Sequence, residues 1–264
     1  MTRFYGRDFL PQFFALILSA LIIHSFFSLV IRPEANAQLH EAEQMNLAAP
    51  RTVSILLKDY EQEACFILLF WSLGIIGLKV RDVRTQHQML GTTYLKLDDG
   101  VSILPDDTKD HSRSLQALGD NEKEGLLPRV LLSALDRFGS SMDIRSAAEA
   151  AKNTSVSEAD RLEAELSMVR YIAWAIPSIG FIGTVRGIGE ALSKAGEAIN
   201  GNIAGVTESL GVAFNSTLVA LLISIFLMFL LHQLQLMQDR LVLGVDEYCE
   251  RNLLARFREN KRSA

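Results

Sequence analysis

Hydroxyl and small side chains recur at helical spacing along an apolar segment in the C-terminal third of the sequence. Ala213, Thr217, Ala220 and Ser224 follow one another at intervals of four, three and four residues, so a helix places them in one narrow stripe. Thr184, in a second apolar segment, offers a matching hydroxyl. Facing hydroxyls can hold a water molecule or bind a carboxyl group, because each both donates and accepts hydrogen bonds. A threonine in a membrane helix can instead bond to its own backbone, which is a structural role.

The segment around Thr184 also contains residues that favour close helix packing. Gly183 and Gly187 are four residues apart, a spacing that lets another backbone approach in lipid. Gly180 precedes them on the same segment, and Pro177 frees one backbone carbonyl and can kink the helix. We expect these four residues to serve helix packing.

Charged residues lie only toward the ends of these two segments. Arg186 and Glu190 are four residues apart and are expected to form an ion pair. Together with Glu208 they either shape the outer mouth of a channel or form an interfacial ion pair. A protein that carries protons through a membrane normally places an ionisable group on the route. Because neither segment has an acid at its centre, a second polypeptide would have to supply it.

One imidazole lies inside an apolar segment, at His24. It is either a proton relay or a histidine held by a hydrogen bond between helices.

The sequence contains no phosphate-binding loop, nucleophile elbow, zinc-helix motif or paired cysteines, so we expect no enzyme, cofactor or metal site. The net charge of -5, from 31 acids and 26 bases, gives no indication of nucleic-acid binding.

The elements that must position these residues are membrane helices. A bilayer core of roughly 30 Å requires about 20 helical residues. No charged residue occurs in 9–31, 64–78 or 209–238, whereas 81–169 is charged throughout. The pattern predicts an all-α, polytopic membrane protein with four spans, at about 11–31, 63–80, 170–192 and 206–232.

Basic residues next to these spans predict that both termini are cytoplasmic. The segment 32–63, with six acids and three bases, and the nearly neutral connection 193–205 are then external. An alternative treats the N-terminal apolar stretch as a secretory signal cleaved near 35–37. The stretch is long for a signal, and Arg32, Pro33 and Glu34 separate it from that site, so we expect an uncleaved anchor.

The charged region between the second and third spans is expected to fold as a cytoplasmic helical insertion. Residues 92–104 are predicted to be strand-like or a loop, and two short helices follow from about Leu126. Ser155 and Glu158 resemble a capping box, which would begin a helix at about Val156 that runs into the third span. The fourth span is expected to continue beyond the membrane, because helical spacing is kept by Leu234, Leu241, Val245, Tyr248 and either Leu253 or Leu254.

These expectations divide the chain into five parts. They are an N-terminal anchor with an external segment (1–62), a second span (63–80), the cytoplasmic insertion (81–169), a channel-forming hairpin of two spans (170–235) and a cytoplasmic C-terminal helix (236–264).

Two stretches carry a family likeness. Residues 180–188, GFIGTVRGI, resemble the GxxGTVxGI signature of the MotA/TolQ/ExbB proton-channel family. Residues 213–221, AFNSTLVAL, are similar to that family's AxxTTxxGL segment, whose second hydroxyl residue faces the pore. Arg186 and Ala220 depart from the usual residues, and the family's frequent glutamate corresponds either to Val212 or, one turn away, to Glu208.

The resemblance implies a pentameric ring of this chain in the bacterial inner membrane. The ring would enclose a dimer of single-span partners of the ExbD, TolR or MotB type, whose transmembrane aspartate carries the proton. Thr184 and Thr217, with Ala213, Ala220 and Ser224, would line the channel. Proton motive force would drive rotation of one component and deliver work, as in a stator.

Alternatives stay open at this point. The glycine and threonine faces can belong to a passive membrane scaffold, and two threonines with backbone carbonyls can also bind sodium. The driven process is open as well, between transport, envelope maintenance, motility and defence.

Overall fold

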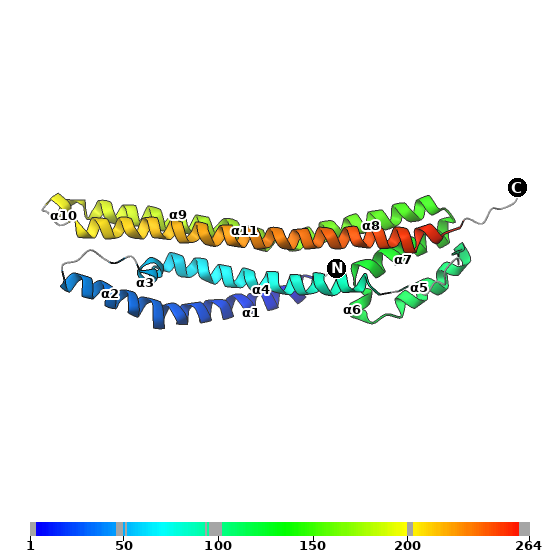
Figure 1. Ribbon diagram of the computed structural model, residues 1–264, viewed down its shortest axis with the longest axis horizontal. Coiled ribbons are helices and arrows are strands. Elements are labelled where there is room, and N and C mark those ends of the chain that lie inside the picture. Colours follow the sequence, from blue (N-terminus) through cyan, green and yellow to red (C-terminus); the bar gives the residue numbers. More distant parts are fainter. Residues whose placement is uncertain are drawn as a thin grey trace. The chain divides into compact units, whose positions relative to one another are not determined.

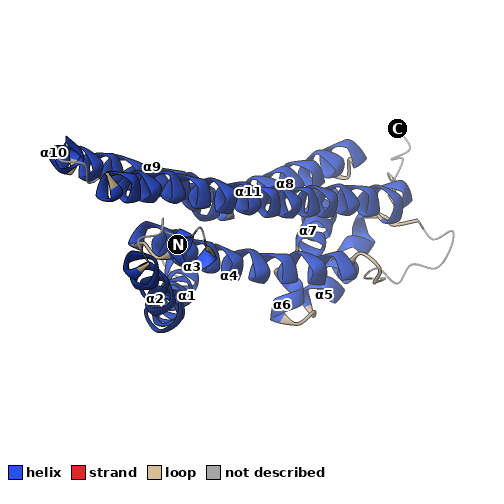
Figure 2. Cartoon of the chain, turned by 60° about the vertical axis from the view of Figure 1, so that its left-hand side comes forward, coloured by secondary structure: helices blue, strands red, loops and turns tan. Residues whose placement is uncertain are grey.

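The computed structural model describes residues 4–45, 50, 52–92, 94, 102–199 and 203–258. Within these ranges the regular elements are helices, and one isolated parallel bridge joins Ile103 to Phe257 (Figures 1 and 2). The predicted all-α class is therefore confirmed. Most of the predicted strand-like or loop segment, 92–104, lies outside the described residues.

In chain order the elements are α1 (Phe4–Phe26), the π-helical turn η1 (Phe27–Ile31), α2 (Arg32–Gln44), α3 (Val53–Leu57), α4 (Tyr60–Met89), η2 (Pro105–Asp107), α5 (Thr108–Gln116), α6 (Asp120–Lys123), α7 (Leu126–Ser141), α8 (Ile144–Glu165), α9 (Ser167–Ser193), α10 (Ala195–Ile199), α11 (Ala204–Asn252) and η3 (Leu254–Arg256).

Four helical stretches of the described chain are long and apolar enough to cross a bilayer. They are Gln12–Ala42, Tyr60–Met89, Ile144–Ser193 and Ala204–Arg256, and each overlaps one predicted span.

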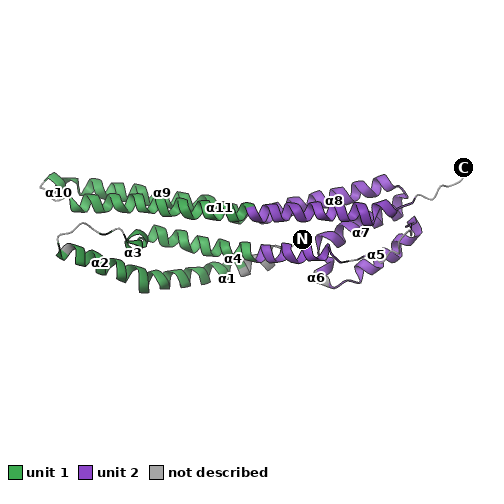
Figure 3. Cartoon of the chain, viewed as in Figure 1, with its two compact units in different colours: residues 1–77, 168–232 green, residues 78–167, 233–264 purple. Residues whose placement is uncertain are grey.

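The chain divides into two compact units (Figure 3). Unit 1 comprises Met1–Gly77 and Met168–His232, and unit 2 comprises Leu78–Ser167 and Gln233–Ala264. Helices α4 and α11 contribute residues to both.

In unit 1, the N-terminal helices pack against the beginning of α4. Ile23, Phe27 and Ile31 are buried and contact the partly buried Leu57, Phe66 and Ile67. At this contact the π-helical turn η1 contains one more residue than an α-helical turn, which locally widens the helix. The indole N–H of Trp71 also donates to the carbonyl of Gln12, at 2.9 Å. The first apolar segment is thus attached to the second by ring packing and by a hydrogen bond.

Helices α9 and α11 lie side by side in unit 1 (Figures 1 and 2). The small residues Ala213 and Ala220 are fully buried, and Ser224 is nearly so. Large apolar side chains of α11 turn outward, Phe214 and Leu222 among them. This is the division that the stripe predicted, with small residues against protein and bulky residues on the surface that is available to lipid.

In unit 2, the predicted start of the helix that leads to the third span is wrong. The helix begins at Ile144, and its N-cap is Asp143, whose carboxylate accepts hydrogen bonds from the backbone N–H groups of Arg145 and Ser146. Met142 just before it has φ 58°, the left-handed conformation that ends α7. The predicted capping residue, Ser155, is buried within α8, and only the turn at Leu166 separates α8 from α9.

Unit 2 is held together by apolar and ionic contacts. The rings of Phe138 and Phe257 stack with centroids 4.0 Å apart, which attaches the end of the described chain to α7. Glu158, which was expected to cap a helix, is instead buried and ion-paired with Arg129 and Arg161. Helix α11 does continue past residue 232, and its predicted face is largely buried, with Leu234, Leu241 and Val245 in the core. Leu253, just after the end of α11, is buried as well.

Candidate functional site

Thr184 of α9 and Thr217 of α11 meet hydroxyl to hydroxyl. Their Oγ1 atoms are hydrogen-bonded, and each also contacts the carbonyl oxygen of Gly180 at 3.2 Å. Thr184 Oγ1 lies 3.1 Å from the carbonyl oxygen of Ala213 as well. Two hydroxyls have two hydrogens between them, so these contacts cannot all be made at once. The two oxygens retain unused lone pairs, and both side chains are half-buried, so the pair can accept a hydrogen bond from an incoming donor.

A glycine face on α9 brings the threonines together. A Cβ atom added to Gly180 would lie 2.5 Å from the Cβ of Ala220, and one added to Gly183 would lie 2.5 Å from that of Ser216. At Gly187 the backbone nitrogen of Ala213 would be 2.7 Å away. These distances are too short for any side chain, so the close approach of α9 to α11 depends on glycine at these three positions.

Pro177 and Ser224 form a matched pair across the same interface. Proline has no N–H, so the carbonyl of Ala173, one turn earlier, loses its usual helical donor. The hydroxyl of Ser224 donates to this carbonyl at 3.0 Å. The stripe residues Ala213, Ala220 and Ser224 therefore lie inside the contact between α9 and α11, and the two threonines are its more exposed polar part.

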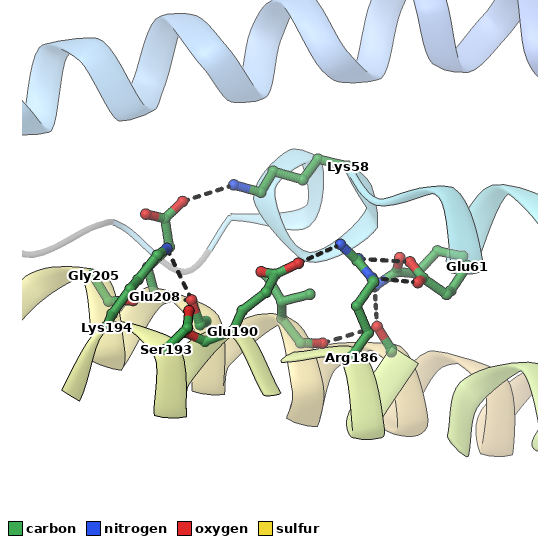
Figure 4. A network of polar contacts seen from close by, with 12 residues as sticks. Lys58, Glu61, Arg186, Glu190, Ser193, Lys194, Gly205 and Glu208 are labelled. Carbon is green, nitrogen blue, oxygen red and sulfur yellow. Dashed lines mark hydrogen bonds and ion pairs between the residues drawn. The ribbon is translucent and has the colours of Figure 1, made fainter. Parts of the chain in front are cut away.

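The charged residues near the α9–α11 connection form two groups (Figure 4). Arg186 pairs with Glu190 as expected, at 3.0 Å. It also makes a two-pronged contact with Glu61 of α4, with Nε to Oε1 at 2.7 Å and Nη2 to Oε2 at 2.9 Å. We call Glu61, Arg186 and Glu190 the Arg186 cluster. Glu208, which the sequence places with Arg186 and Glu190 at the outer mouth, is paired with Lys58, at 3.2 Å.

The second candidate span supplies acids that belong to no sequence motif. Glu63 is buried, accepts a hydrogen bond from His24 Nδ1 at 2.7 Å and is ion-paired with Arg32. The guanidinium of Arg32 also lies 4.1 Å from the ring centre of Tyr60. His24 therefore makes the hydrogen bond between helices that was one of its two expected roles. Glu61 and Glu63 are two residues apart, and this spacing directs them to different helix neighbours.

No cluster of three or more histidine, cysteine, aspartate or glutamate side chains in the described residues has an arrangement that could hold a metal ion. Cys65 and Cys249 are both buried free thiols. Cys65 contacts the carbonyl of Ile176 at 3.8 Å. Burial raises the pKa of Cys249, which lies beyond the predicted fourth span, to about 12, so its thiolate is not populated at neutral pH.

Comparison with known proteins gives one family match. Residues 122–247 match the sequence model of the MotA/TolQ/ExbB proton channel family. The matched segment includes α7, α8, α9, α10 and most of α11, and so contains both threonines and the glycine face. No curated protein matches the chain. With its four apolar helices, the chain has the character of a multi-pass membrane protein. The match confirms, for residues 122–247, the family that residues 180–188 and 213–221 indicated: the MotA/TolQ/ExbB proton channel family.

Proposed function

We propose that this chain is the channel-forming subunit of an inner-membrane complex that converts proton motive force into mechanical work. The observation that carries the proposal is the contact between Thr184 and Thr217, which places two hydroxyls on a half-buried surface. There is no acid in residues 166–189 or 209–238, so this surface has hydrogen-bonding capacity but no proton carrier of its own.

The missing carrier belongs to a partner in this proposal. Five copies of the chain form a ring around a dimer of single-span proteins, and an aspartate in the partner's span meets the threonine pair. When that aspartate is protonated, it donates a hydrogen bond to a threonine oxygen; when it is ionised, a threonine hydroxyl donates to it. The pair can therefore stabilise both states of the carrier without being charged.

The stripe has two tasks in this arrangement. Thr184 and Thr217 face the channel and contact the partner, while Ala213, Ala220 and Ser224 lie behind them in the contact between α9 and α11 and fix the distance between the helices. The Arg186 cluster, with the Lys58–Glu208 pair, lies at the outer mouth. Both termini, the insertion 81–169 and the segment 236–264 are cytoplasmic, as the basic residues beside the spans favour.

Proton uptake into vesicles tests this proposal. The full chain is reconstituted with a single-span partner that has an aspartate in its span, and uptake is followed with a pH-sensitive dye. We expect Thr184→Val with Thr217→Val to abolish partner-dependent uptake, because valine keeps the shape but removes the hydroxyl. Thr207→Val is the matched control, since Thr207 is exposed and, among the described residues, its hydroxyl bonds only to the carbonyl of Ile203, one turn earlier in the chain. Unchanged uptake in the double variant would overturn the proposal.

A passive scaffold is the second candidate, and the tight glycine contact favours it. A scaffold would form the same oligomer and conduct nothing. Loss of uptake with an intact oligomer in the double threonine variant would exclude the scaffold. Replacing sodium with potassium at a fixed pH gradient separates proton coupling from sodium coupling.

A further inference from the structure

Two buried oxygen atoms next to the Arg186 cluster lack a hydrogen-bond donor. Gln62 is only 1% exposed, and its Oε1 atom has no partner among the described residues. Its Nε2 atom is used, because it donates to the carbonyl of Leu56 at 3.2 Å and lies 3.5 Å from Ser216 Oγ. Asp59, one turn earlier, likewise has a buried Oδ2 atom without a partner.

An unsatisfied buried acceptor is costly, and two in one place call for a donor. Leaving such an atom without a partner forfeits its solvation by water. Gln62 is also a side-chain hydrogen-bonding neighbour of Asp59, so the two unsatisfied oxygens belong to adjacent side chains. A proton bound to the carboxylate, or a water molecule between the two side chains, meets this need.

The charges around Asp59 come from three directions. Lys58 is its chain neighbour, Glu61 lies on α4, and Arg186 approaches from α9. Helix α11 contributes the uncharged Ser216 through Gln62, and its Glu208 is held by Lys58. Arg186 is itself occupied by Glu61 and Glu190. Its charge is therefore shared among three carboxylates, of which Asp59 is one.

We propose that Asp59 and Gln62 form a proton-binding site at the outer end of the channel, which supplies protons to the partner's aspartate beside the threonine pair. This inference rests on the function proposed above. A hydronium ion from the outer side gives its proton to the Asp59 carboxylate and leaves as water, and the new O–H supplies the missing donor. Gln62 links this site to the channel, since Ser216, which its amide approaches, directly precedes Thr217 on α11.

The electrostatics of Asp59 agree with this role. Burial raises the pKa of Asp59 above its ordinary value of 3.8, and the charge of Glu61 adds to the rise. Lys58, Arg186 and the Gln62 side chain oppose it to a smaller extent. The carboxyl group therefore holds a proton at a higher pH than an exposed aspartate does, as a group that collects protons must.

Infrared difference spectroscopy of the full chain in lipid nanodiscs tests proton binding directly. We expect a protonated-carboxyl band that titrates above pH 3.8 in the wild type and is lost in Asp59→Asn. Asparagine has the same shape and carries an N–H donor, so this variant is expected to fold. Asp110→Asn is the matched control, because Asp110 is exposed and pairs with Arg113 within its own helix, and this variant should keep the band.

Two results would overturn the inference. One is a carboxyl band that titrates above pH 3.8 and survives in Asp59→Asn. The other is a titration of Asp59 that shifts with added sodium but not with potassium, which would make Asp59 part of a sodium site.

Proton uptake with the partner separates this inference from the proposed function. Asp59→Asn should lower the rate severalfold at high external pH and less at low external pH. If its uptake equals that of the wild type while the double threonine variant has none, the proposed function stands and Asp59 has no part in it. If the wild type takes up no protons, the proposed function fails, and the infrared titration alone decides whether Asp59 binds a proton.

Discussion

The hydroxyl of Ser224 donates a hydrogen bond to the carbonyl of Ala173 at 3.0 Å, across the contact between α11 and α9. That carbonyl lacks its usual helical donor because the residue four positions later is Pro177. In lipid, where no water can compensate, each such carbonyl needs another partner. A kink-forming residue on one helix and a polar residue on the other thus complement each other, which fixes how the two helices are aligned along their axes.

Removing this hydroxyl should destabilise the contact. We expect Ser224→Ala to lower the free energy of unfolding by about 0.5 to 1.5 kcal/mol, the usual range for a lost hydrogen bond. Ser178→Ala is the control, because Ser178 is exposed and its hydroxyl bonds to the carbonyl of Trp174 within the same helix. Denaturant unfolding in detergent micelles measures both. With Pro177→Ala as background, Ser224→Ala should cost less, since the alanine restores the backbone N–H that proline lacks; an equal cost in both backgrounds would contradict this interpretation.

The glycine face provides a second prediction. Gly183→Ala should destabilise the contact by about 1 to 3 kcal/mol, because the new methyl group overlaps Ser216. Gly189→Ala should be neutral or stabilise the helix by up to about 1 kcal/mol, because no atom lies within 4 Å of the added Cβ. Thermal unfolding of the two purified variants provides the comparison. The opposite order would show that α9 and α11 do not pack through this face.

The contact between Glu61 and Arg186 should be the strongest in its cluster. We expect Glu61→Gln to cost on the order of 1 kcal/mol, discounted because Arg186 is 41% exposed. Glu190→Gln should cost about 0.3 to 0.5 kcal/mol, as is usual for a pair four residues apart on one helix. The double charge reversal Glu61→Arg with Arg186→Glu should recover part of the loss. A double-mutant cycle of unfolding free energies that gives no coupling would disprove the assignment.

The N-cap of α8 predicts a pH dependence. Hydrogen bonds from the side chain and backbone of Ser146 lower the pKa of Asp143 below its ordinary value of 3.8. A carboxyl group with a lowered pKa in the folded state stabilises the fold above its unfolded-state pKa, and this stabilisation is lost as the pH falls through the folded-state value. The protection of the Arg145 and Ser146 amides against hydrogen exchange, taken relative to the intrinsic rate at each pH, should therefore fall on acidification below pH 3.8. In Asp143→Asn, which caps without titrating, we expect no such step, and an equal step in both proteins would contradict the assignment.

The runs without charged residues were sufficient to predict four apolar helices long enough to cross a bilayer, and periodicity was sufficient to predict the face of α11 that packs against α9. Both follow from one helix and its surroundings, as the exposed Phe214 and the buried Ala220 illustrate. The start of α8 was not predictable from one motif, because Ser155 and Glu158 have capping-box spacing and yet lie within the helix. There, Glu158 has two arginine partners, of which Arg129 comes from α7.

Partners from distant parts of the chain were the main omission. The four-residue spacing predicted that Arg186 pairs with Glu190. The two-pronged contact with Arg186 is made instead by Glu61, which is 125 residues away in sequence. Asp59 and Gln62 belong to no recognisable sequence motif. Their significance comes from buried atoms without donors, which no sequence pattern encodes.

Cross-linking to the partner tests the orientation of the threonine surface most directly. In a background with Cys65→Ala and Cys249→Ala, cysteine is introduced at Thr217 or at Leu222, which is 59% exposed on another face of α11. A second cysteine is placed next to the aspartate in the partner's span. We predict that disulfide formation in membranes joins the partner to position 217 and not to position 222. Cross-linking from position 222, with none from position 217, would contradict the central claim that the threonines face the partner.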